Sequence, residues 1–186
     1  MRTHVALLRG VNVGGRNRLA MADLRDIVAS LGHTDVSTYI QSGNAVFTSK
    51  EKDSVAIAEA LERAIAAESA VKPRVVVLTR GELDAVVAGN PFPKENDGKR
   101  LHAEFGMDEF GPDGIKAVAA AELRARAKGS LDEAVVVGRT LYLHTPDGLG
   151  RSVLAAELSR AGAGDARSAR TMRNWATVKK LLDLLA

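Results

Sequence analysis

The sequence contains no cysteine, and this absence removes several kinds of chemistry at once. Disulfides, thiolate metal sites and a cysteine nucleophile are all excluded. Aromatic residues make up only 4% of the chain, so the core must be aliphatic. No apolar run is long enough to cross a bilayer, and the amino terminus does not have the pattern of a signal peptide. We therefore expect a soluble, cytoplasmic protein with no membrane partner.

What is present is an ordinary globular mixture. The 186 residues are 46% hydrophobic and 26% charged, which suits one large domain or two small ones. The formal net charge of +3 is weak evidence for nucleic-acid binding, because a near-neutral surface rich in arginine gives the same sum. The positions of the arginines are more informative than their number. They gather in two places, Arg9, Arg16 and Arg18 and then Arg167, Arg170 and Arg173.

Hydrophobic spacing predicts the element order β-α-β-β-α-β in each half of the chain. In the first half the expected strands are 2–8, 35–41, 44–49 and 72–79, with helices at 21–31 and from Ser54 as a candidate N-cap. In the second half the expected strands are 100–106, 133–138, 140–145 and 165–171, with helices along Ile115, Val118, Ala119 and Leu123, at 150–162, and from Trp175 to the end. Between the halves, Thr79 and Glu82 predict a capping box and a short helix, and 89–99 reads as a loop with two prolines.

This repeated order predicts an α+β fold of two tandem ferredoxin-like (βαββαβ) subdomains with an extra C-terminal helix. The expected boundaries are 1–80 for the first subdomain, 81–99 for a connector helix and loop, and 100–186 for the second subdomain with its terminal helix. The halves share no obvious residue identity, so the prediction rests on element order alone. The alternative is one continuous mixed sheet with helices on both sides.

The ferredoxin-like topology places the end of the first strand beside the turn between the second and third strands. Two polar, glycine-containing segments would then meet at one edge of the first sheet, and the first of them leads into a helix N-terminus that favours anions. The candidate ligand-binding residues are Arg9, Asn12, Gly14, Gly15, Arg16, Asn17, Gln41, Ser42 and Asn44. Alternatively, the glycines, Gly10 included, supply turn conformations and the asparagines bond their own backbone.

The spacing of Gly10 and Gly15 also resembles that of a phosphate-binding P-loop, but Arg16 and Asn17 replace its lysine and hydroxyl residue. We interpret this as chance, with anion binding retained and NTP hydrolysis excluded. A second convergence is expected where the loop at 146–152 meets the segment that follows the last strand. Its candidate residues for a second anion site are Arg151, Ser152, Arg170 and Arg173, with Asn174 and Ser152 as ordinary helix caps in the alternative interpretation.

The sequence points to no metal site, no cofactor and no catalytic residue. Its histidines, at positions 4, 33, 102 and 144, lack the spacing of metal ligands. The three of them that fall on strands, His4, His102 and His144, are better explained by half-exposed sheet positions than by catalysis. Asp108 and Glu109 are expected to be solvated.

Several segments resemble one known family. They are ALLRGVNVGGRNRLAMADLR, TYIQSGNAVF, NPF, YLHTPDGLGRS and RNWATVKKL, which follow one another over nearly the whole chain. They are similar to the bacterial family called domain of unknown function 1697, whose members have a fold similar to a tandem pair of ferredoxin-like subdomains. The resemblance implies no reaction, and it covers both candidate sites. One departure is Met172 before Arg173, where a threonine or glycine is expected, and it affects only the shape of the second site.

We therefore expect a cytoplasmic protein that binds an anionic or phosphorylated small molecule at the edge of the first sheet. Arg9 and Arg16 would neutralise its charge, and Gln41, Ser42 and Asn44 would orient it. Two alternatives stay open, a nucleic-acid-binding module and an enzyme of unknown group-transfer reaction. A purely structural role of the glycine segments is the third. The sequence identifies neither the ligand nor the oligomeric state.

Overall fold

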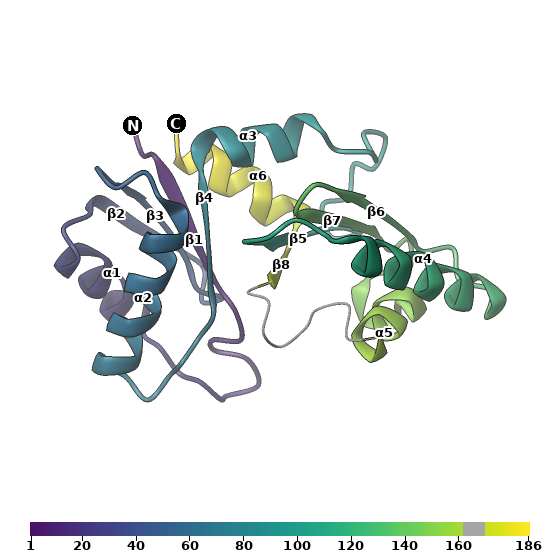
Figure 1. The fold of residues 1–186 in the computed structure, drawn as a ribbon, viewed down its shortest axis with the longest axis horizontal. Coiled ribbons are helices and arrows are strands. Elements are labelled where there is room, and N and C mark those ends of the chain that lie inside the picture. The colour runs from purple at the N-terminus through teal and green to yellow at the C-terminus, as the bar shows by residue number, and fades with distance from the viewer. Residues whose placement is uncertain (162–169) are drawn as a thin grey trace. The chain divides into compact units, whose positions relative to one another are not determined.

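A computed structural model describes residues 1–161 and 170–186, which fall into two compact units. Unit 1 holds Met1–Ala85 and Lys179–Ala186, together with Arg170 and Thr171. Unit 2 begins at Val86 and includes Met172–Val178. The described residues form two four-stranded antiparallel sheets and six α-helices, so the chain has a mixed α+β fold (Figure 1).

Unit 1 contains the first sheet, whose strands lie in the order β2-β3-β1-β4. Its helices α1 and α2 pack together beside the sheet (Figure 1). The elements are β1 (His4–Leu8), α1 (Met21–Ser30), β2 (Thr34–Tyr39), β3 (Asn44–Thr48), α2 (Ser54–Glu68), β4 (Val75–Thr79) and the start of α3 (Arg80–Ala88). All five residues of β1 are buried, which is expected for a central strand covered on both faces.

Unit 2 contains the second sheet, with the order β6-β7-β5-β8, except for the first two residues of β8, and a core between its strands and the helices α4 and α5. The elements are β5 (Leu101–Gly106), α4 (Pro112–Ala127), β6 (Glu133–Val137), β7 (Thr140–His144), a short 3-10 helix η1 (Leu149–Arg151), α5 (Val153–Arg160), β8 (Arg170–Asn174) and the start of α6 (Trp175–Leu184). The strand order of this sheet repeats that of the first.

Local signals in the sequence located most helix ends correctly. The capping box is present, because Glu82 Oε2 accepts from Thr79 N at 2.7 Å and Thr79 Oγ1 accepts from Glu82 N at 3.2 Å. Asn174 Oδ1 accepts from Thr177 N at 2.8 Å and so caps α6, as predicted. The cap of α2 lies one residue earlier than expected, because the side chain of Asp53, not of Ser54, accepts from the first free amides.

One prediction in the second half was wrong in detail, and a second is tested only in part. The predicted apolar face of α4 includes Ile115, Ala119 and Leu123, but these residues are exposed. The helix instead buries Val118, Ala121 and Ala125. The strand expected at 165–171 lies mostly outside the described residues. The described strand is β8, so the segment from Arg170 to Asn174 belongs to the sheet and is not a connection after it.

A buried carboxylate links α4 to α5. The side chain of Glu157 is only 5% exposed and pairs with Arg124 Nε at 2.8 Å, Lys128 Nζ at 2.6 Å and Arg160 Nη1 at 2.8 Å. Hydrogen bonds from Lys128 and then Arg124 lower the pKa of Glu157 to about 2. The side chains of the three cations are 47–69% exposed, so the carboxylate is the desolvated partner of the cluster.

This cluster predicts a defined acid sensitivity. Because the folded-state pKa of Glu157 is lowered, its ionised form stabilises the fold above the ordinary glutamate pKa of about 4.3, and this contribution is lost as the pH falls towards about 2. Urea denaturation over that pH range should show wild type more stable than Glu157→Gln at neutral pH, with the difference closing in acid. A difference that does not change between neutral pH and pH ~2 would contradict this account.

Candidate functional site

The two polar segments predicted to meet at the edge of the first sheet lie side by side. Leu8 N donates to Gly43 O at 2.8 Å, and Asn12 Nδ2 donates to Gln41 O at 2.8 Å. Gly43 has φ +74°, and a Cβ added to it would lie 2.5 Å from Val11 Cγ2 and 2.8 Å from Leu8 Cβ. The bend at 40–43 is therefore pressed against the loop that follows β1, with glycine required at the contact.

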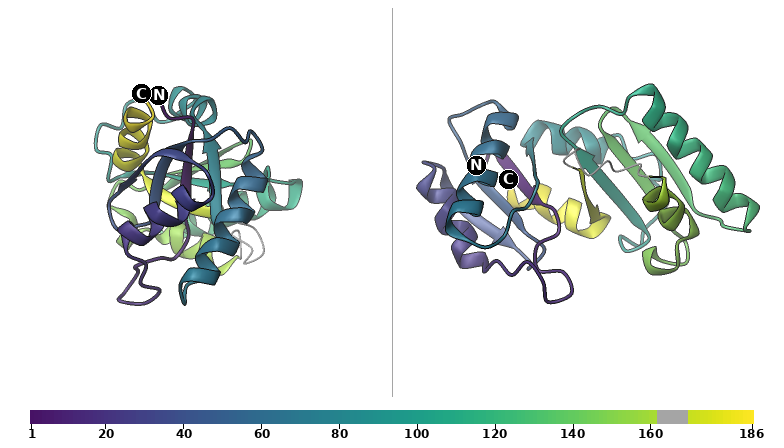
Figure 2. Two further views of the ribbon diagram at one scale, coloured as in Figure 1. Left: turned by 90° about the vertical axis from the view of Figure 1, so that its left-hand side faces the viewer. Right: turned by 60° about the horizontal axis from the view of Figure 1, so that its bottom comes forward.

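The loop that follows β1 forms a small hairpin of its own (Figure 2). Asn12 N donates to Asn17 O, and Arg16 N donates to Val13 O, both at 3.0 Å. Gly14 and Gly15 have φ +57° and +74°, which is the signature of a two-residue type I′ turn. Since these residues pair with each other, the stretch does not wrap around a phosphate as a P-loop does. The amides of Gly14 and Gly15 pair with no described residue and stay available at its tip.

The side chain of Asn12 joins this hairpin to the start of α1. Its Oδ1 accepts from Leu19 N at 2.9 Å, and its Nδ2 donates to Leu19 O at 2.9 Å as well as to Gln41 O. Leu19 is buried and precedes the helix by two residues. Asn12 thus holds the hairpin, the bend and the helix N-terminus in one arrangement.

A hollow of about 430 Å³ opens at this point. It is lined by Asn12, Gly15, Arg18, Leu19, Ala20 and Gln41. Ala20 is the N-cap of α1 and supplies no side-chain hydrogen bond, so the first amides of the helix lack the usual side-chain acceptor. These amides and the helix dipole favour an anion, although Asp23 in the first turn offsets part of the effect.

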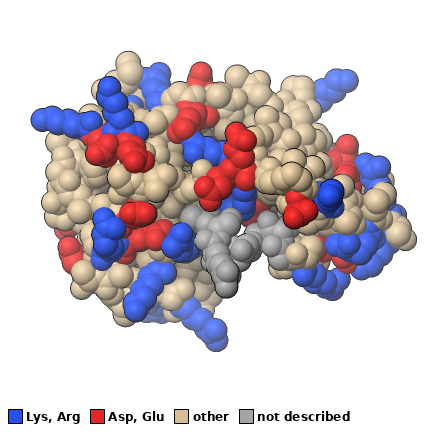
Figure 3. Space-filling model, in the orientation of Figure 1, with Lys and Arg blue, Asp and Glu red and all other residues tan. Residues whose placement is uncertain are grey.

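Three exposed arginines, Arg9, Arg16 and Arg18, belong to the loop that forms the hairpin, and Arg18 lines the hollow. Within the described parts of the chain, none of the three pairs with a carboxylate. Elsewhere, Arg2, Arg63, Arg74, Arg100, Arg124, Arg126 and Arg160 all form ion pairs. On the face drawn in Figure 3, basic and acidic side chains are interspersed. Arg25, Arg80 and Arg151 also form no ion pair among the described residues, so what distinguishes Arg9, Arg16 and Arg18 is that they are close together in the sequence and all exposed.

Some predicted ligand-binding residues maintain the shape of the loops. Asn17 Nδ2 donates to Gly10 O at 3.0 Å. Asn44 is fully buried, and its Nδ2 donates to Tyr39 O and to Ser42 Oγ. Asn17 and Asn44 thus stabilise the loops, as in the alternative in which the asparagines bond the backbone. Gln41, in contrast, is exposed beside the hollow.

The bend itself carries backbone strain. Ile40 has φ +48°, a region that β-branched residues rarely adopt, and its side chain is 50% exposed. Neither packing nor turn preference explains an isoleucine here. Strain of this kind is often found at functional sites.

The residues of the predicted second anion site are distributed over several environments. Arg170 and Arg173 are both buried, and their separation by three positions places them on opposite faces of β8. Arg173 Nη1 donates to Met172 O, and burial lowers the pKa of Arg173 to about 10. Ser152 caps α5 and donates to the buried carboxylate of Asp132 at 2.9 Å, while Arg151 is exposed in η1. The second anion site stays a prediction.

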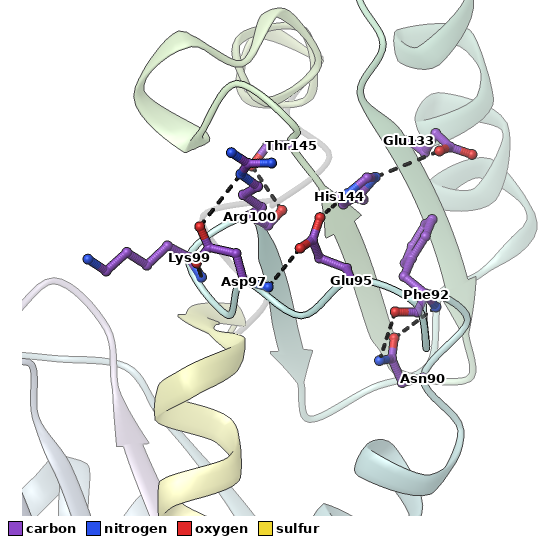
Figure 4. Close-up of polar contacts among 9 residues, drawn as sticks. All are labelled: Asn90, Phe92, Glu95, Asp97, Lys99, Arg100, Glu133, His144 and Thr145. Carbon is purple, nitrogen blue, oxygen red and sulfur yellow. Dashed lines mark hydrogen bonds and ion pairs between the residues drawn. The ribbon is translucent and has the colours of Figure 1, made fainter.

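The sequence interpretation missed a polar group in unit 2 (Figure 4). His144 Nε2 lies 2.9 Å from Glu95 Oε2, and its Nδ1 lies 3.7 Å from Glu133 Oε1. The ring of Phe92 stacks against the imidazole, with 5.2 Å between centroids. Glu95 and His144 are 49 residues apart, so no short motif could have revealed the pair.

The other strand histidines are more buried than predicted. His4 and His102 are 4% and 6% exposed, not half-exposed, and burial lowers the pKa of each. The described residues contain no group of three or more acidic or histidine side chains that could hold a metal ion. They also contain no helix with the length and apolarity needed to span a membrane.

The contact at Gly43 predicts the effect of a single methyl group. Gly43→Ala combines an unfavourable φ with a clash against Leu8 and Val11, and should destabilise unit 1 by about 2–4 kcal/mol. Gly15→Ala is the matched control, because Gly15 also has positive φ but open space around it, and should cost about 1 kcal/mol. Urea denaturation measures both. Equal losses would show that the contact at Gly43 does not matter.

Comparisons with known proteins agree with the resemblance read from the sequence. One solved structure, described as a conserved bacterial protein, SP0830, from Streptococcus pneumoniae, is similar to this chain with a TM-score of 0.65 at 23% sequence identity. The similarity covers 100% of this chain and 99% of that one, and at this identity it shows the fold alone. No curated protein matches the sequence. A family described as "Protein of unknown function (DUF1697)" matches residues 1–142, and the chain therefore belongs to that family.

Proposed function

We propose that the protein binds a small anionic molecule, most simply a phosphorylated one, in the hollow between the Asn12–Asn17 hairpin and the bend at 40–43. The observation that carries the proposal is the set of exposed arginines without carboxylate partners beside an uncapped helix N-terminus. Hydrogen bonds to charged groups contribute about 1.5–3 kcal/mol each, so two or three of them suffice for measurable affinity.

Each part of the site would have its own role. Arg18 lines the hollow, and Arg9 and Arg16 belong to the same loop, so their guanidinium groups would bind the phosphoryl oxygens. The free amides of Gly14, Gly15 and the first turn of α1 would add uncharged donors. Gln41 would orient the rest of the ligand, with Ser42 and Asn44 supporting the bend from within.

Binding is proposed in preference to catalysis because of what lines the hollow. None of its six lining residues is a carboxylate or an imidazole, so no described group there is placed to take a proton from a substrate. A group-transfer enzyme remains an alternative that would need a base from the ligand or a cofactor.

The proposal includes a finer assignment of the fold. The strand orders β2-β3-β1-β4 and β6-β7-β5-β8, each joined as β-α-β-β-α-β, support two tandem ferredoxin-like subdomains at 1–80 and 100–186, with 81–99 as connector. We further propose a cytoplasmic location, as expected from the sequence.

Calorimetric titration with inorganic pyrophosphate, glucose 6-phosphate and ATP tests the proposal. Wild type should bind at least one of them, and the double substitution Arg9→Ala with Arg18→Ala should weaken that binding by about a hundredfold, the loss of two charge-assisted hydrogen bonds. Arg63→Ala is the control, because Arg63 is an exposed arginine on α2 that pairs with Glu59. Loss of affinity in the control as well would indicate a general charge effect, and unchanged affinity in the double variant would exclude this site.

The salt dependence of binding distinguishes the nucleic-acid alternative from binding of a small ligand. A protein that neutralises several phosphates loses affinity for nucleic acid steeply as salt concentration rises. A mobility shift of RNA or DNA that depends on Arg9, Arg16 and Arg18 would favour that alternative over a small ligand.

A further inference from the structure

A second pocket lies in unit 2, and none of its lining residues belongs to the proposed anion site in unit 1. It has a volume of about 480 Å³ and is formed where the loop that follows α3 passes the end of the β6–β7 hairpin (Figure 4). Its walls combine two prolines and an aromatic ring with four ionisable groups. The lining residues are Pro91, Phe92, Pro93, Lys94, Glu95, Glu133 and His144.

The register of the hairpin places two of the ionisable groups together. Glu133 on the edge strand β6 is paired directly with His144 on β7, so the two side chains stand on the same face of the sheet. Glu95 approaches the imidazole from the loop, opposite Glu133 (Figure 4). His144 is thus placed between two carboxylates.

The hydrogen bonds of Glu95 indicate which nitrogen of the His144 imidazole carries a proton. Asp97 N donates to Glu95 Oε1 at 2.7 Å, and the hydrogen bond from His144 is the main reason that the pKa of Glu95 is lowered. An ionised carboxylate only accepts, so His144 Nε2 must be the donor. In the neutral ring Nδ1 is then an acceptor. It is buried without a hydrogen-bond partner, and 3.7 Å away lies the Glu133 carboxylate, another acceptor.

While the ring is neutral, two acceptors face each other across 3.7 Å, an arrangement that a donor between them would satisfy. We propose that this pocket binds a small organic ammonium ion, which donates N–H groups to His144 Nδ1 and to Glu133 and packs its hydrocarbon part on Phe92 and the two prolines. The Glu133 side chain is 54% exposed, so it can rotate to admit the ligand. The ring of Phe92 beside the imidazole adds a face that attracts cations.

The charges favour a cation over an anion. With a neutral imidazole, Glu95, Glu133 and Lys94 give the pocket a net charge of about −1. An anionic ligand would depend on Lys94, whereas an ammonium ion would be repelled by it. A proton on Nδ1 competes with the ligand, because an imidazolium would donate to Glu133 itself.

The test uses the full chain at about pH 8, with benzylammonium as the probe and benzyl alcohol as its uncharged counterpart, followed through the imidazole NMR signals of His144. Benzylammonium should shift these signals saturably, and benzyl alcohol should bind about tenfold more weakly or not at all. Glu133→Gln, a conservative change at a half-exposed position, should weaken benzylammonium about tenfold, the order of one charge-assisted hydrogen bond. Lys94→Met should bind it at least as tightly as wild type.

Two results would overturn the proposal. The first concerns the wild-type protein: equal affinity for the two probes, or no movement of the His144 signals with benzylammonium. The second concerns the variants: benzylammonium binding that is unchanged in Glu133→Gln or lost in Lys94→Met. Thermal unfolding confirms that each variant is folded. Phe92→Leu, which keeps apolar contact and removes the aromatic face, should weaken benzylammonium about threefold. These outcomes are independent of the phosphate titrations, since no residue of this pocket belongs to the site in unit 1.

Discussion

The contact between the Gly43 bend and the loop after β1 is the constraint on which the first site depends. The bond from Leu8 N to Gly43 O extends the β1–β3 ladder just past the Leu7–Asn44 pair, so both segments leave the sheet together. Asn12 then offsets the entropic cost of ordering the loop, with three hydrogen bonds that join hairpin, bend and helix. The residues that build this shape differ from the arginines that would bind a ligand, and so shape and affinity can be changed separately.

Several features at this edge are unfavourable for stability, and they occur together. Ile40 combines an exposed apolar side chain with positive φ, Ala20 stands where a capping side chain would stabilise α1, and Val13 is 66% exposed. Arg9, Arg16 and Arg18 lack the carboxylate partners that seven other arginines have. A sequence shaped by stability alone would remove such features at little cost. Their concentration around one hollow is the strongest argument that the edge serves a purpose other than folding.

Local signals made much of this predictable. The Thr79–Glu82 capping box, the glycines at hairpin turns and the alternation of strands and helices all depend on neighbours in sequence, and the structure contains them. The register of the β6–β7 hairpin also follows from its two-residue turn, so the Glu133–His144 pair could have been derived. Glu95 could not, because its position depends on the path of an irregular loop. The apolar face of α4 was misassigned for a related reason: its buried side is largely alanine, which carries a weak signal, while Ile115 and Leu123 face outward.

The two units have the same strand order, but the groups at their candidate sites carry opposite charges. In unit 1 the candidate site lies where β1 ends, and it offers donors, namely guanidinium groups, glycine amides and a helix N-terminus. In unit 2 the pocket lies where β7 ends, at the opposite end of the corresponding sheet, and it places an imidazole between two carboxylates. The sheets fix only where loops leave the core, and the loop residues decide what can bind there. Because the same fold can carry different functions, the charge of the side chains at each end of a sheet is a better guide to the ligand than the fold is.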